Sequence, residues 1–92
     1  MVGVMADERA LREVADDVHR WSNGPRDRYA RHRHAYTKIL RCVDGSIDFV
    51  LDDRVISLKA GDRMVLPAGT PHAAVVGASG CSCIEGKARS QS

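Results

Sequence analysis

Three histidines in this sequence have the residue type and spacing of a metal-binding site. His32 and His34 lie two residues apart, and His72 follows in a separate, turn-rich segment. On a β-strand, residues two apart point to the same face, so His32 and His34 can converge on one ligand. His72 would join them from a neighbouring strand. Each histidine taken alone is better explained as a polar strand or loop residue, so the metal hypothesis depends on the set.

We therefore expect His32, His34 and His72 to bind one divalent transition metal ion. Imidazole nitrogen is a ligand for several such ions, and the ligand type alone does not select one of them. The expected cofactor is a zinc, iron, nickel, manganese or copper ion. Three neutral ligands leave the charge of the ion uncompensated, so we also expect an anion to complete its coordination.

Tyr36 and Lys38 continue the two-residue spacing of the histidines and are the candidate catalytic residues. The hydroxyl of Tyr36 can donate a proton or a hydrogen bond. Lys38 has three interpretations: its ammonium extends into solvent, it pairs with an acid inside the fold, for which Glu85 is the best candidate, or it lies beside the metal. In the third case it is a neutral amine or a cation that orients an anion.

Length and charge limit the classes of partner. The 92 residues are enough for one domain with a thin apolar core. A formal net charge of +2, from 14 basic and 12 acidic residues, gives no overall reason to expect nucleic acid or a membrane as a partner. The basic stretch from Arg20 to Arg41 is interpreted as a solvated face, with anion binding as the alternative. The thin core and open sheet edges favour a homodimer.

The N-terminus and the cysteines favour a soluble cytoplasmic protein. No stretch approaches the roughly 20 apolar residues that span a bilayer, and the start lacks the pattern of a secretory signal. The odd number of cysteines fits a reducing compartment. Cys42, Cys81 and Cys83 are interpreted as small apolar core residues, with soft-metal binding or redox pairing of Cys81 and Cys83 as the alternative.

The pattern along the chain predicts one short helix followed by many short strands. Apolar residues at helical spacing predict a helix over 7–15, with Asp7 as its N-cap. After residue 18, turn strings recur about every eight residues, which is typical of a β-sandwich or β-barrel. They are Ser22–Pro25, Asp44–Gly45, Asp52–Asp53, Gly61–Asp62, Pro67–Gly69 and Gly77–Gly80. The Asp-Gly string predicts a tight hairpin turn.

Between the turns, apolar residues alternate with polar ones, which predicts strands with one buried face. The residues expected to face the core are Ile47, Phe49, Leu51, Ile56, Leu58, Met64 and Leu66. The same rule predicts one strand over 31–42, with the histidines, Tyr36 and Lys38 on the inner face beside Leu40 and Cys42. The pocket is expected to be lined by His32, His34, His72, Tyr36 and Lys38, together with apolar residues such as Phe49, Met64 and Leu66. Trp21 and Tyr29 are expected at the barrel mouth or in a dimer interface, and His19 at the surface.

The histidine motifs resemble those of the cupin superfamily, in particular a small single-domain cupin of the cupin 2 type. Its first motif contains His-x-His and its second contains Pro-x-Gly followed by histidine. Here these are His32-Arg33-His34 and Pro67-Ala68-Gly69 with His72, and the resemblance extends from Arg26 to Val76. Arg26 replaces the leading glycine of the first motif, and Val76 replaces an asparagine of the second. Lys38 replaces a glutamate that is commonly the fourth metal ligand, so the resemblance implies a three-histidine site.

The resemblance implies an all-β double-stranded β-helix, or jelly-roll, cupin barrel with a short N-terminal helix. The expected division is a helix and arm over 1–17, the barrel over 18–86 and a flexible tail over 87–92. We expect a small cupin that binds a divalent metal ion through three histidines and binds or acts on a small molecule. The alternative is a non-catalytic ligand-binding or sensor module with a metal-free or degenerate site. Fold does not decide between enzyme and binder.

Overall fold

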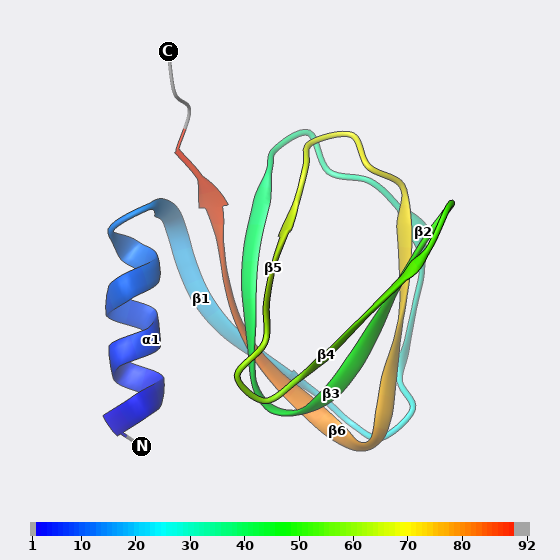
Figure 1. The fold of residues 1–92 in the computed structure, drawn as a ribbon, viewed down its shortest axis with the longest axis horizontal. Coiled ribbons are helices and arrows are strands. Elements are labelled where there is room, and N and C mark those ends of the chain that lie inside the picture. Colours follow the sequence, from blue (N-terminus) through cyan, green and yellow to red (C-terminus); the bar gives the residue numbers. More distant parts are fainter. Residues whose placement is uncertain (1, 90–92) are drawn as a thin grey trace.

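One helix precedes six β-strands in the computed structural model, which describes residues 2–89 (Figure 1). The elements are α1 (Val2–Arg12), β1 (Ala15–Asn23), β2 (Arg28–His32), β3 (Lys38–Leu51), β4 (Val55–Lys59), β5 (Arg63–Leu66) and β6 (His72–Ala88). The expected antiparallel β-barrel with an N-terminal helix is confirmed. Within the described part of the chain, α1 is too short and too polar to cross a membrane.

The pairing of β3 with β6 is the central feature of the fold. The two strands pair antiparallel from Lys38 opposite Lys87 to Leu51 opposite His72. The other strands attach to this pair: β1 and β2 hydrogen-bond to β6, whereas β4 and β5 hydrogen-bond to β3. Figure 1 shows that both long strands bend in the middle, so each contributes to two walls of the barrel.

Glycines produce these bends, and the hairpin expected at Asp44–Gly45 is wrong. β3 continues through this string, and the β3–β6 register shifts on both sides of it. Gly45 has a φ of 68°, and Gly80 on β6 has a φ of 80°. A glycine in the left-handed region forms a β-bulge that bends a strand without ending it. The turn expected at Gly77–Gly80 is wrong for the same reason, because β6 continues through it.

The inner core confirms the predicted alternation. Ile47, Phe49, Leu58, Met64 and Leu66 are buried inside the barrel, and the half-buried Leu51 and Ile56 pack against them. The three cysteines lie in the same cluster, as expected of small apolar core residues. Burial raises the pKa of all three thiols, which favours the neutral form over the thiolate that binds metals.

A second apolar cluster explains why the helix differs from its prediction. α1 begins and ends earlier than the expected range 7–15, and Asp7 lies inside it, 3.6 Å from Arg41 rather than at the N-cap. The helix must end by Arg12 because Ala15 already pairs with β6. Leu11 and Ala15 pack with Ile39 and Ile84 on the outer face of the long strands. The helix therefore covers a part of the sheet that the alternation placed in solvent.

The predicted domain boundaries lie within elements of the structure. β1 begins at Ala15 and β6 extends to Ala88, whereas the expected barrel covers 18–86. Residues 90–92 of the expected tail lie outside the described residues. The division of the chain into arm, barrel and tail stays a prediction.

Replacing Gly45 with alanine will destabilise the protein more than the same change at Gly69. Both glycines have a left-handed φ, but a Cβ at Gly45 would overlap the carbonyl oxygen of Gly80, whereas a Cβ at Gly69 meets nothing within 4 Å. We expect Gly45→Ala to lower the free energy of unfolding by about 3 kcal/mol or to prevent folding. Gly69→Ala should cost about 1 kcal/mol. Urea denaturation measures both, and equal costs would contradict the account of the bend.

Candidate metal centre

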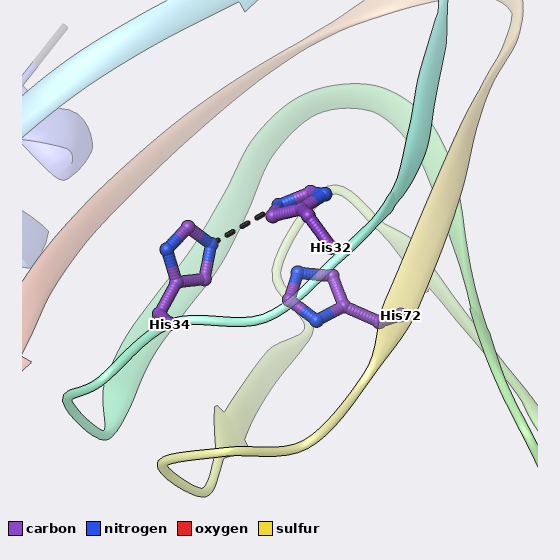
Figure 2. Close-up of side chains that lie close together, drawn as sticks. All are labelled: His32, His34 and His72. Atoms are coloured by element: carbon purple, nitrogen blue, oxygen red, sulfur yellow. Dashed lines mark hydrogen bonds between the residues drawn. The ribbon is translucent and has the colours of Figure 1, made fainter.

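The three histidines come together from two strands and a connection (Figure 2). His32 is the last residue of β2 and His72 the first of β6, and the two are register partners. His34 lies in the connection over 33–37. One potential ligand atom from each imidazole lies within 4.8 Å of the others. The predicted convergence of the three imidazoles is therefore present in the structure.

The route by which they converge differs from the prediction. The single strand expected over 31–42 is wrong, because β2 ends at His32 and β3 begins at Lys38. The chain must leave β2, which pairs with β6, and cross to β3. His34 is therefore placed by a loop. The backbone N–H of Gly69 holds this loop by donating to the carbonyl oxygen of His34 at 2.8 Å.

Backbone carbonyls orient two of the imidazoles. The Nδ1 atom of His32 lies 2.6 Å from the carbonyl oxygen of Ala30, and Nδ1 of His72 lies 2.9 Å from that of Thr70. A carbonyl only accepts, so Nδ1 carries the proton in both rings and Nε2 keeps its lone pair. Metal-binding histidines are commonly oriented by a carbonyl in this way.

The spacing of the nitrogens fits a shared ion. The Nε2 atoms of His32 and His34 are 3.1 Å apart. Two nitrogens at the usual 2.0–2.1 Å from a tetrahedral zinc ion would be about 3.3 Å apart. The structure thus already holds these two donors close to the separation that one ion requires, with His72 beside them at ring-centroid distances of 4.3 and 5.3 Å.

The surroundings of the cluster favour neutral imidazoles. Burial is the main cause of a lowered pKa for His34, followed by the positive charge of Lys38. Burial also lowers the pKa of His72. Both rings therefore keep the metal-binding, unprotonated form to lower pH than a free imidazole does.

Tyr36 lies beside the histidines but outside the cavity next to them. Its ring centroid is 5.2 Å from that of His34, and Nζ of Lys87 lies 4.8 Å from the centre of the Tyr36 ring. The expected position of Tyr36 at the pocket wall is wrong, because Tyr36 lies in the connection between β2 and β3 and does not line the cavity. Its contacts fit a residue that packs against His34, and its predicted catalytic role is untested.

A cavity of about 240 Å³ adjoins the three imidazoles. It is lined by His19, Trp21, Tyr29, His32, His34, Lys38, Ile47, Phe49, His72, Ala74 and Glu85. The expected lining by Phe49 is present, whereas Met64 and Leu66 are buried in the inner core and do not line it. Trp21 and Tyr29 lie at the cavity, with ring centroids 6.2 Å apart in an edge-to-face arrangement.

A buried ion pair lies in the same cavity. Lys38 Nζ is 3.4 Å from Glu85 Oε2, with the two side chains 14% and 10% exposed. This contact agrees with the interpretation in which Lys38 pairs with an acid inside the fold, for which Glu85 was the expected partner. The other oxygen of Glu85 accepts a 2.6 Å hydrogen bond from the indole N–H of Trp21, and His19 Nε2 lies 3.8 Å from Oε2.

The sequence contained a signal for His19 and Trp21 that the prediction did not use. They are two residues apart on β1, so they share a strand face, and His19 is the register partner of Glu85. His19 is exposed, as expected for a surface residue, but it also lines the cavity. The face of β1 that carries His19 and Trp21 lines the cavity because β1 pairs with β6.

Comparison with known proteins agrees with the fold and the histidine motifs. The family model of the cupin domain matches residues 19–80. None of the curated proteins matches the sequence. Among solved structures, a cupin-2 domain containing protein from Shewanella frigidimarina is similar at 20% identity and a TM-score of 0.67, over 78% of this chain and 69% of that one.

Two further structures illustrate the range of similar proteins. KdgF from Halomonas sp. shares 21% identity at a TM-score of 0.66, over 80% of this chain and 69% of that one. The cupin domain of Cnp3 from Schizosaccharomyces pombe shares 9% identity at a TM-score of 0.71, over 79% of this chain and 55% of that one. At such identities the likeness shows the fold alone. The chain spans about two thirds of the length of the first structures it matches. With its jelly-roll barrel and a family match over most of its length, this chain belongs to the cupin family.

Proposed function

We propose that this cupin binds one divalent transition metal ion through His32, His34 and His72, and that it binds a small molecule in the adjoining cavity. The observation that carries the proposal is the convergence of three imidazoles within 4.8 Å at the wall of that cavity. The carbonyl contacts of His32 and His72 place the ring proton on Nδ1, so Nε2 is the ligand atom that each ring offers; a bound ion would replace the hydrogen bond between the Nε2 atoms of His32 and His34.

The donor set also supports a role for a small anion. Among the described residues, the cluster that can hold a metal consists of the three histidines, with no carboxylate among them. Three imidazoles bring no negative charge, so a bound ion would keep its full charge and have positions for further ligands. It would supply a Lewis acid to a molecule in the cavity. The identity of the metal, a homodimer and a cytoplasmic location stay predictions.

A non-catalytic binding module is the second candidate function. The ion pair favours it, because the pairing with Glu85 positions the ammonium of Lys38 at the cavity, where it can bind a ligand without any proton transfer. Tyr36 packs against His34 and does not reach the cavity. In this alternative the same cavity binds a ligand without turnover, with or without a metal.

Removing one histidine of the cluster will weaken metal binding. We expect purified wild-type protein, after reconstitution with zinc, to hold about one ion per chain. His32→Ala and His72→Ala should each lower the affinity at least tenfold, because two imidazoles hold an ion poorly. Elemental analysis and calorimetric titration give stoichiometry and affinity.

His19→Ala is the matched control for these variants. It removes the fourth histidine of the chain, which lines the cavity but is not part of the cluster, so metal binding should be retained. A wild-type protein that holds no metal after reconstitution contradicts the proposal. Equal losses in all three variants would show that the loss is not specific to the cluster.

The pH dependence of the metal-free protein provides an independent check. The pKa values of His34 and His72 are lowered from 6.5, so as pH falls the unfolded chain takes up protons before the folded one. Their contribution to stability is therefore complete above pH 6.5 and is lost as pH falls below it. We expect NMR titration of the imidazoles to give midpoints below 6.5 for both residues. Midpoints above that value would contradict the burial of neutral rings.

A further inference from the structure

Lys38 lines the cavity, and its ammonium carries N–H groups beyond the one that faces Glu85. Its ammonium has three N–H groups, and its ion-pair partner among residues 2–89 is Glu85, at 3.4 Å. The side chain is 14% exposed and lines the cavity. A mostly buried ammonium needs acceptors for its remaining donors. In the cavity those acceptors are either water or a bound molecule.

Glu85 accepts a hydrogen bond from Trp21 in addition to its ion pair, so the carboxylate fixes the position of the Lys38 ammonium. Trp21 donates to one carboxylate oxygen at 2.6 Å, and the other oxygen faces Lys38 and His19. The indole hydrogen bond holds the carboxylate at the cavity wall. The ammonium is thus placed within the same cavity as the imidazoles, with its free N–H groups available to a bound molecule.

Apart from its four histidines, Lys38 and Glu85, the cavity is lined by apolar and aromatic side chains. Ile47, Phe49 and Ala74 are buried residues of the inner core that also line the cavity. Trp21 and Tyr29 add aromatic surface. A ligand that matches this lining combines an anionic group for Lys38 with an apolar body for these side chains.

We propose that the cavity selects a small monocarboxylate with an apolar body, and that Lys38, positioned by Glu85 and Trp21, is the residue that recognises the carboxylate. The proposal rests on the proposed function in taking this cavity as the ligand site. Beyond that function, the proposal names the chemical class of the ligand and the residue that selects it.

The Lys38–Glu85 pair favours a single negative charge over two. One ammonium is available, and a carboxylate already lies 3.4 Å from it. A phosphate monoester carries close to two negative charges at neutral pH, and its second charge would be repelled by Glu85. A neutral amide of the same shape would lose the charge-assisted hydrogen bond to Lys38. The structure therefore ranks carboxylate above both.

Three ligands with the same isobutyl body test this ranking in the wild-type protein. They are 3-methylbutanoate, 3-methylbutanamide and isobutyl phosphate, each titrated into metal-free and zinc-loaded protein. Trp21 is the single tryptophan of the chain and lines the cavity, so its fluorescence reports binding, and calorimetry gives the affinity. We expect the carboxylate to bind at least about tenfold more tightly than the other two in the metal-free protein, where the selection depends on Lys38 and Glu85 alone; the zinc-loaded form shows what a bound ion adds.

A paired substitution then assigns the preference to Lys38. Lys38→Met combined with Glu85→Gln removes both charges, which avoids leaving Glu85 buried without its partner. In the metal-free protein, where zinc cannot bind the anion, the preference for carboxylate over amide should disappear. Lys59→Met is the matched control, because Lys59 is an exposed lysine of β4 outside the cavity, and it should bind the ligands as the wild type does.

The outcomes separate this inference from the metal proposal. A wild-type protein that binds no metal yet prefers the carboxylate supports the role of Lys38 and contradicts the metal site. A protein that binds zinc but takes carboxylate, amide and phosphate alike, or binds none of them, overturns the inference. A carboxylate preference that survives in the metal-free paired variant also overturns it, because a group other than Lys38 would then make the selection.

Discussion

The antiparallel pairing of β3 with β6 is the constraint on which the rest of the structure depends. It brings Glu85 beside the start of β3, where Lys38 lies, and it sets His72 at the far end of β6. The bends at Gly45 and Gly80 let both strands form two walls of the barrel (Figure 1). Both ends of the pair consequently contribute to one cavity. Without the bends, Lys38 and His72 would lie at opposite ends of an extended sheet.

Much of the fold could be predicted from local pattern, and the errors have a common cause. Alternation identified the inward residues because burial of one strand face imposes a period of two. It does not reveal what covers the other face, so the packing of Ile39 beneath α1 was missed. Asp44–Gly45 was read as a turn because glycine favours a left-handed φ in turns and bulges alike. Only the partner strand decides between them.

The site could also be predicted only in part, because local spacing does not show which distant strands lie side by side. Motif spacing predicted that three histidines would meet, and they do. It did not predict that a loop would place His34, nor that Tyr36 would pack behind it. Glu85 was the expected partner of Lys38, but the contribution of Trp21 and His19 depends on β1 lying beside β6, a pairing between distant parts of the chain. Lys38, at the place of a glutamate in the cupin motif, thus changes the charge of the cavity and leaves the three imidazoles as the ligands of the proposed metal site.

X-ray absorption of the zinc-loaded protein tests the central claim most directly, because it reports the atoms bound to the ion. The account predicts nitrogen and oxygen neighbours at about 2.0–2.1 Å, with the outer-shell scattering of imidazole rings and no sulfur. A zinc–sulfur distance of about 2.3 Å would place the ion at the cysteines of the inner core. A shell of oxygen alone would show an ion bound to the surface. Either result would contradict a metal centre formed by His32, His34 and His72.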